Sequence, residues 1–114
     1  MTSAVTTHVL DTARGAPAQG VPVRLERLEP GSGQHELVAE AVTDADGRAR
    51  DLGPASLPPG TYRLTFDTAS YFAADGREVF YPEVVVTAVL RDPHQHYHLP
   101  LLLAPFAYST YRGT

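Results

Sequence analysis

Histidine and arginine side chains carry most of the chemistry that this 114-residue sequence can offer. Three of its five histidines, His94, His96 and His98, alternate along one short run, and His8 lies near the start. In an extended strand, side chains at i and i+2 lie on the same face, about 6.5 to 7 Å apart. Imidazole titrates near neutral pH, so these histidines could transfer a proton or bind a metal ion such as zinc.

Two conventional roles for these histidines require further residues. A zinc site needs additional ligands, and neither a suitably spaced carboxylate nor an HExxH motif accompanies the three histidines. A serine hydrolase would pair a histidine with a nucleophile such as Ser109, but the GxSxG elbow is missing. Both remain alternatives, and we expect His94 and His96 to lie at the surface or behind the reacting groups.

The last four residues combine an aromatic ring, a guanidinium, a glycine and a hydroxyl. Chain ends are usually frayed and tolerant of change. This composition, together with a free carboxylate, instead suits the binding of a small polar molecule. We therefore expect the tail, Tyr111, Arg112, Gly113 and Thr114, to take part in a ligand site.

Composition argues against several classes of protein. The nine basic residues are all arginines spread along the chain, and the net charge is -4, so the basic stripe of a nucleic-acid-binding protein is missing. The sequence contains no cysteine, which rules out disulfides, thiolate metal ligands and a cysteine nucleophile. It has neither an apolar run of membrane-spanning length nor a signal-peptide pattern. We expect a cytoplasmic protein without nucleic-acid or membrane partners.

Short β-rich runs, separated by Gly, Pro and Asp, recur at the spacing typical of a sandwich. They predict an all-β, antiparallel two-sheet sandwich of about eight strands that forms a single domain over residues 1–114. The segment Thr68 to Asp75 breaks this pattern and predicts one short helix with a Thr or Asp cap. The predicted strands are Val5–Leu10, Val21–Leu28, Glu36–Thr43, Arg48–Leu52, Tyr62–Asp67, Glu83–Leu90, His96–Leu103 and Tyr108–Arg112.

The predicted strand from His96 to Leu103 carries polar and apolar groups on its outer face. Alternation turns Tyr97 and three leucines toward the core, which leaves His96, His98, Pro100 and Leu102 facing outward. Proline interrupts a ladder unless it lies at an edge or a bulge, and an outward leucine is apolar surface suited to a partner. We therefore expect an oligomer with the histidines at the subunit contact.

Six segments together resemble the transthyretin-related 5-hydroxyisourate hydrolase family. Each is weak alone, but they follow one another in a single register across nearly the whole chain. Transthyretin, the hormone carrier, shares the frame but lacks the histidine pair, the arginine after the turn and the tail. Members of the family usually end in Tyr-Arg-Gly-Ser, whereas this sequence ends in Thr114, which keeps a hydroxyl. The segments are Thr7–Asp11, Gly20–Val23, Thr43–Arg48, Phe80–Val84, His96–Leu103 and Tyr111–Thr114.

The resemblance implies hydrolysis of 5-hydroxyisourate to 2-oxo-4-hydroxy-4-carboxy-5-ureidoimidazoline in urate catabolism, without a metal or cofactor. It implies a homotetramer, built as a dimer of dimers, with substrate sites in the channel at the dimer–dimer interface. His8 and His98 would activate water, Arg48 would stabilise the developing charge, and the tail Tyr111–Thr114 would bind the substrate. The alternative functions are a small-molecule binding protein that uses the same channel and a structural β-sandwich adhesion module.

Overall fold

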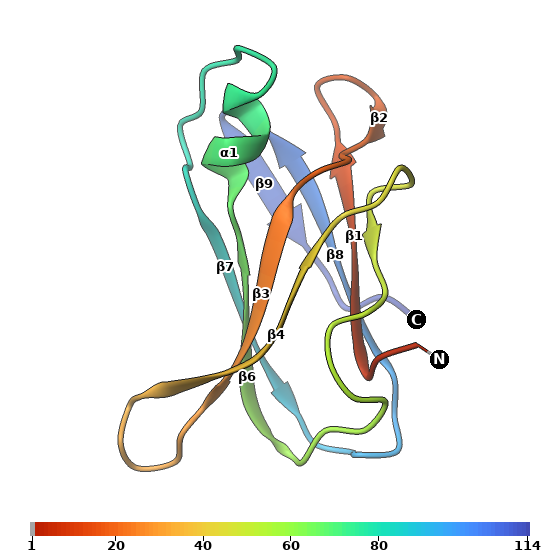
Figure 1. The fold of residues 1–114 in the computed structure, drawn as a ribbon, viewed down its shortest axis with the longest axis vertical. Helices are drawn as coiled ribbons and strands as arrows, with labels where there is room; N and C mark the ends of the chain where they lie inside the picture. Colours follow the sequence, from red (N-terminus) through yellow and green to blue (C-terminus); the bar gives the residue numbers. More distant parts are fainter. Residues whose placement is uncertain (1) are drawn as a thin grey trace.

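Two β-sheets packed face to face make up the computed structural model, which describes residues 2–114 (Figure 1). Within this range, nine strands and one short helix confirm the all-β, two-sheet sandwich. The first sheet has the order β2-β1-β8-β9, with β5 also paired to β1, and the second has the order β4-β3-β6-β7. The elements are β1 (Val5–Asp11), β2 (Ala16–Pro17), β3 (Pro22–Leu28), β4 (His35–Val42), β5 (Arg48–Ala49), β6 (Gly60–Phe66), α1 (Thr68–Ala73), β7 (Val84–Leu90), β8 (Tyr97–Ala104) and β9 (Ala107–Thr110).

One strand pair departs from the expected antiparallel arrangement. Strands β1 and β8 run parallel, with seven residue pairs from Val5 opposite Tyr97 to Asp11 opposite Leu103. All other pairings in the two sheets are antiparallel. A parallel pair requires a long crossover connection, and here all four strands of the second sheet lie between β1 and β8 in sequence.

The short elements differ from the sequence prediction for local reasons. Helix α1 is capped by Asp67, whose carboxylate accepts a hydrogen bond from the Ser70 amide at 3.0 Å, and it ends two residues before the predicted Asp75. The predicted strand from Arg48 to Leu52 shrinks to β5, because the chain then turns toward Ser3. The Ser3 hydroxyl accepts a hydrogen bond from the Leu52 amide at 2.9 Å.

Strand β9 ends at Thr110 instead of the predicted Arg112. Its register with β8 would place Pro100 opposite Tyr111, at a position where an amide should donate across the ladder. Proline has no amide hydrogen, so the pairing is interrupted there, and the Thr110 hydroxyl donates to the Pro100 carbonyl at 2.7 Å. Pro100 is itself buried, contrary to the exposed position expected from alternation.

Apolar side chains from both sheets and from α1 fill the space between the layers. Tyr97, Leu101 and Leu103 of β8 are buried, as alternation predicted, whereas Leu99 is only half-buried. This core fixes the face that β1 and β8 turn outward. The largest fully buried side chains include Phe66, Phe72, Leu25, Leu52, Leu64, Leu101 and Leu103. No helix within residues 2–114 is long and apolar enough to cross a membrane.

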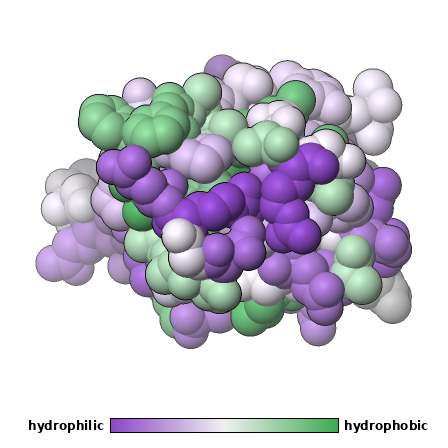
Figure 2. Space-filling view, turned by 90° about the horizontal axis from the view of Figure 1, so that it is seen from above, coloured by the Kyte–Doolittle hydropathy of each residue, from purple (hydrophilic) through white to green (hydrophobic). Residues whose placement is uncertain are grey.

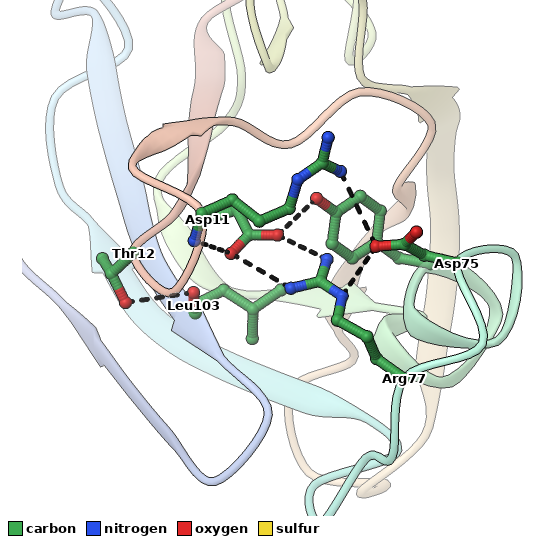
Figure 3. Close-up of polar contacts among 7 residues, drawn as sticks. Asp11, Thr12, Asp75, Arg77 and Leu103 are labelled. Atoms are coloured by element: carbon green, nitrogen blue, oxygen red, sulfur yellow. Dashed lines mark hydrogen bonds and ion pairs between the residues drawn. The ribbon is translucent and has the colours of Figure 1, made fainter.

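A buried carboxylate joins the end of β1 to the segment after α1 (Figure 3). Asp11 is 1% exposed and accepts hydrogen bonds from the Tyr71 hydroxyl at 2.7 Å and from the Arg77 guanidinium at 2.6 Å. Arg77 also pairs with Asp75, at 2.8 Å. On the end of the molecule that carries α1, hydrophilic residues gather in the middle, and hydrophobic groups lie at one edge (Figure 2).

Hydrogen bonds decide the charge state of this carboxylate. Burial alone would raise the pKa of Asp11, but hydrogen bonds from Arg77 and Tyr71 outweigh burial and hold the pKa below its usual value. A group whose pKa is lowered by folding stabilises the protein above its unfolded pKa. That contribution is lost as the pH falls through the lowered pKa of the folded state.

Replacement of the buried carboxylate should destabilise the fold. We expect Asp11→Asn to lower the free energy of unfolding by about 2 to 3 kcal/mol at neutral pH, because it removes the buried one of the two carboxylates that pair with Arg77 and weakens the charged hydrogen bonds at this site. Denaturant titration measures this loss, which should shrink as the pH falls below 4. The exposed pair of Arg14 and Asp75 provides the control, since Arg14→Gln should cost less than about 0.5 kcal/mol. Equal losses in the two variants would contradict the assignment.

Candidate active site

A polar pocket of about 200 Å³ opens beside the parallel pair of strands. Three of the predicted site residues, Arg48, His98 and Thr114, line it. The two ends of the described chain lie side by side here, with Thr2 and Thr114 both in the lining (Figure 1). The remaining lining residues are Thr6, Thr7, Arg50 and His96. The lining side chains include two arginines and no Asp or Glu, and Thr114 adds the carboxylate of the tail, so the pocket is suited to a strongly polar molecule.

A tight turn before β5 places Arg48 at this pocket. The Asp44 carboxylate accepts hydrogen bonds from the backbone amides of Asp46 at 2.9 Å and of Arg48 at 3.0 Å. Gly47 has a φ of +77°, and a Cβ there would overlap the carbonyl oxygen of Val9. Only glycine satisfies both constraints, so the turn packs directly against β1 and brings Arg48 opposite His8.

His8 lies next to the pocket but does not line it. Its Nε2 donates a hydrogen bond to the Asp46 carbonyl at 2.8 Å. A carbonyl oxygen can only accept, so Nε2 carries the proton, and Nδ1 of a neutral ring has the free lone pair. In the first sheet, His8 is flanked by Arg48 on β5 and by Pro100 on β8.

His98 is the half-buried imidazole of the pocket. Burial lowers the pKa of its ring below the ordinary histidine value. The positive charge of Arg48 and the neighbouring rings of His96 and His8 lower that pKa further. The ring is therefore neutral at neutral pH and able to accept a proton.

The tail returns to β8 beyond the interruption at Pro100. The Gly113 amide donates to the His98 carbonyl at 2.8 Å, which forms an isolated bridge between the two residues. A Cβ on Gly113 would lie 2.7 Å from Cδ2 of His98 and 3.2 Å from Cγ. The bare glycine backbone thus packs against the imidazole, and Thr114 continues from there into the pocket lining.

Tyr111 and Arg112 lie on the other side of His98. They line a second pocket of about 230 Å³, which also contains His98 and is otherwise mostly apolar. The Arg112 guanidinium lies over the ring of Tyr97, 5.1 Å from its centroid, whereas Tyr111 is 59% exposed. Apart from His8 and Gly113, the predicted site residues therefore form two groups, one with Arg48 and Thr114 and the other with Tyr111 and Arg112, and His98 belongs to both.

Comparison with known proteins agrees with this fold. Residues 5–113 match the sequence profile of the HIUase/Transthyretin family. The chain belongs to this family. It is 48% identical to the 5-hydroxyisourate hydrolase of Mus musculus over 113 residues, covering 98% of this chain and 96% of the mouse protein.

Solved structures of the family have the same fold. The structure of Klebsiella pneumoniae 5-hydroxyisourate hydrolase has a TM-score of 0.83 and 42% identity, and the match covers 96% of this chain and 98% of that one. Sea bream transthyretin in complex with thyroxine has a TM-score of 0.89 at 32% identity, and the match covers 96% and 94% of the two chains. The family resemblance and the transthyretin-like sandwich inferred from the sequence are confirmed.

The pocket of this family member contains residues that the sequence did not single out. Thr6 and Arg50 line it. His96, which was expected at the surface or behind the reacting groups, is exposed and also lines the pocket, with its ring centroid 6.5 Å from that of His98. Alternation along β1 could have indicated Thr6, because it lies two residues before His8 and therefore on the same face. No pattern in the sequence could have placed Arg50 at the pocket, since β5 ends at Ala49 and the path of the chain beyond it depends on tertiary contacts.

The geometry of the described residues gives little support to the two alternatives, a zinc site and a serine hydrolase. No group of three or more His, Cys, Asp or Glu side chains within residues 2–114 is arranged to hold a metal ion. Ser109 is exposed on β9 opposite Leu102, and it does not line the pocket that contains His98, Arg48 and Thr114.

A methyl group at Gly113 should displace the imidazole of His98. We expect Gly113→Ala to shift the His98 ring resonances in the NMR spectrum while the rest of the spectrum stays native, because the added Cβ would overlap Cδ2. Ser109→Ala is the matched control, since it alters the same β8–β9 ladder at an exposed position. An unchanged His98 signal in Gly113→Ala would show that the tail does not press on this ring.

Proposed function

We propose that this protein hydrolyses 5-hydroxyisourate to 2-oxo-4-hydroxy-4-carboxy-5-ureidoimidazoline in the breakdown of urate. It is an enzyme whose full-length relatives, from mouse to bacteria, are named 5-hydroxyisourate hydrolases. We take residues 1–114 as one catalytic domain. The cytoplasmic location expected from the sequence stays a prediction.

One observation carries the proposal: an arginine, a histidine and the tail line one pocket although they come from three different segments of the chain. Arg48 follows the turn before β5, His98 lies in β8, and Thr114 ends the tail. A carrier protein has no need for a proton acceptor. A hydrolase requires one, since water must lose a proton as it adds to a carbonyl group.

The geometry supports His98 as the general base. Its lowered pKa keeps the ring neutral, so Nε2 can accept a proton from water as the water oxygen attacks the substrate carbonyl. The C–N bond of the ring then breaks, and the departing nitrogen receives a proton. His8, whose Nε2 is held by the Asp46 carbonyl, lies beside this path and orients water or substrate.

Arg48 supplies the positive charge that the reaction needs. Its guanidinium remains protonated at all working pH values and can donate hydrogen bonds to the oxygen that becomes negative. The tail acts mainly by position: Gly113 packs against His98, and Thr114 borders the pocket that contains Arg48. Tyr111 and Arg112 line the pocket on the other side of His98, where they would bind the part of the substrate that extends past the ring.

We further propose that the protein is a homotetramer, a dimer of dimers whose channel contains the sites. On the outer face of the first sheet, Leu10 pairs with Leu102, four residue pairs along the β1–β8 register from the Thr6–His98 pair. A second apolar region supports assembly, because four partly exposed aromatic residues contact one another near α1. These residues are Phe80, Tyr81, Phe106 and Tyr108.

The activity is tested by following freshly generated 5-hydroxyisourate against its spontaneous decay. We expect strong acceleration that persists with a chelator. The rate should fall at least about a hundredfold in His98→Ala and in Arg48→Gln, the losses typical of a missing general base and charge stabiliser. The acid limb of kcat/KM should lie below the ordinary histidine pKa, because the pKa of His98 is lowered.

The matched control for this assay is Arg24→Gln, which removes an arginine from the other sheet. It should leave turnover unchanged. A well-folded protein that gives no acceleration would favour a small-molecule binding protein on the transthyretin frame. Full activity in His98→Ala would remove the proposed base.

Assembly is tested by light scattering at micromolar concentration, where we expect a mass four times that of the chain. Leu102→Glu should reduce this mass, because it places a charge in the proposed dimer–dimer contact. Leu37→Glu is the control, since Leu37 is exposed on β4 of the other sheet. A monomeric wild-type protein would overturn the tetramer.

A further inference from the structure

The hydroxyl group of Thr6 lies between two histidine rings. Its Oγ1 is 2.9 Å from Nδ1 of His98 and 3.0 Å from Nε2 of His96. The parallel register places Thr6 directly beside His98, and the residue is only 5% exposed. The two rings are nearly parallel, with an interplanar angle of 17°. His96 itself is exposed, so this chain of contacts runs from the pocket to solvent.

The single hydrogen of the Thr6 hydroxyl couples the tautomers of the His98 and His96 rings. A threonine hydroxyl has one hydrogen and two lone pairs, so it can donate to one ring and must accept from the other. If it donates to His96, Nδ1 of His98 carries a proton, and Nε2 of His98 is free to accept one. If it donates to His98, Nε2 of His98 carries the proton and can only donate. The tautomer of His98 is therefore tied to the tautomer of His96.

We propose that Thr6 is a positioning residue for His98 and that Thr6 and His96 together form a proton relay between His98 and solvent. The proposal rests on the function proposed above for His98. When Nε2 of His98 takes a proton from water, its Nδ1 proton passes to the Thr6 oxygen. The Thr6 hydroxyl proton then passes to Nε2 of His96. One proton has moved from water to His96, and no group is oxidised or reduced.

The reverse transfer delivers the proton to the leaving nitrogen. His98 donates from Nε2, while Nδ1 recovers a proton from Thr6, and Thr6 recovers one from His96. His98 thus acts first as a base and then as an acid without keeping a positive charge. The relay gives His98 both roles with one neutral ring.

Electrostatics favours charge on His96 over charge on His98. His98 is half-buried, and burial together with the charge of Arg48 of β5 and the ring of His8 of β1 opposes an imidazolium there. Arg112 of the tail lines the pocket on the other side of the ring. Arg50 also lines the pocket, although Asp44, 3.7 Å away, partly compensates its charge. His96 is exposed, so water can stabilise its positive charge.

The test compares variants that remove the hydroxyl, the second ring or neither. Thr6→Val has nearly the same shape but no hydroxyl, and Thr6→Ser retains the hydroxyl. His96→Gln can still accept a hydrogen bond from Thr6 but cannot store a proton. His94→Gln is the matched control, because His94 is exposed in the same segment and makes no side-chain contact with Thr6.

We expect a single His98 tautomer, with the proton on Nδ1, in the imidazole ¹⁵N spectrum of the wild-type protein. Thr6→Val should give a mixture of tautomers and lower kcat on the order of tenfold with KM unchanged, the value of one buried hydrogen bond. Thr6→Ser should restore both. His96→Gln should keep the tautomer but lower kcat, and the double variant with Thr6→Val should lose no more than the larger single loss.

An unchanged tautomer and an unchanged pH–rate profile in Thr6→Val would overturn the proposal. Full activity in His96→Gln would overturn the relay, and this exposed substitution stays informative if Thr6→Val fails to fold. The NMR measurement needs no substrate. A protein inactive toward 5-hydroxyisourate would therefore refute the proposed function, while the coupling of the two rings would be decided separately.

Discussion

The parallel pairing of β1 with β8 is the constraint on which the rest of the structure depends. It joins segments that are 92 positions apart, where the Thr6 hydroxyl meets His98, and the Thr7 hydroxyl donates to the Leu99 carbonyl at 2.6 Å. On its inner side, the same pair contributes Val9 and Leu101 to the core. Because side chains alternate along a strand, burial of that inner face forces Thr6, His8 and His98 onto the outer one. A shift of one residue would exchange the two faces.

Two backbone segments, the turn before β5 and the tail, pack closely against the β1–β8 pair and complete the pocket. Gly47 lets the turn before β5 pack on β1, and Gly113 lets the tail pack on the imidazole of His98. In both places a side chain would occupy space that backbone or ring atoms already fill. Pro100 ends the β8–β9 pairing, because it has no amide hydrogen to donate across the ladder. The chain therefore leaves β8 after Thr110, where the tail begins. Two glycines and a proline thus set the path of the chain around one histidine.

The two ends of β1 differ in the charge state that their surroundings favour: a charged carboxylate at one end and a neutral imidazole at the other. At its end, Asp11 keeps a buried negative charge because Arg77 and Tyr71 satisfy it, and this pairing anchors the strand to the segment after α1. Near its start, cations surround His98 without a carboxylate among the lining side chains, so the ring favours its neutral form. The first arrangement stabilises the fold, and the second prepares a group to accept a proton.

Local pattern in the sequence determined the longer strands, the helix and the family, because alternation, turn residues and motif order are properties of neighbouring residues. It also named Arg48, His98 and the tail as candidates. It did not indicate the two-residue strand β2, whose residues are typical of a turn. Tertiary structure alone decided that β1 and β8 run parallel, that β9 stops at Thr110, and that Tyr111 and Arg112 lie across His98 from Thr114. The contact of Thr6 with two histidines was equally beyond local pattern. Such features depend on contacts between segments far apart in the chain, and these are fixed only when the two sheets bury their shared core.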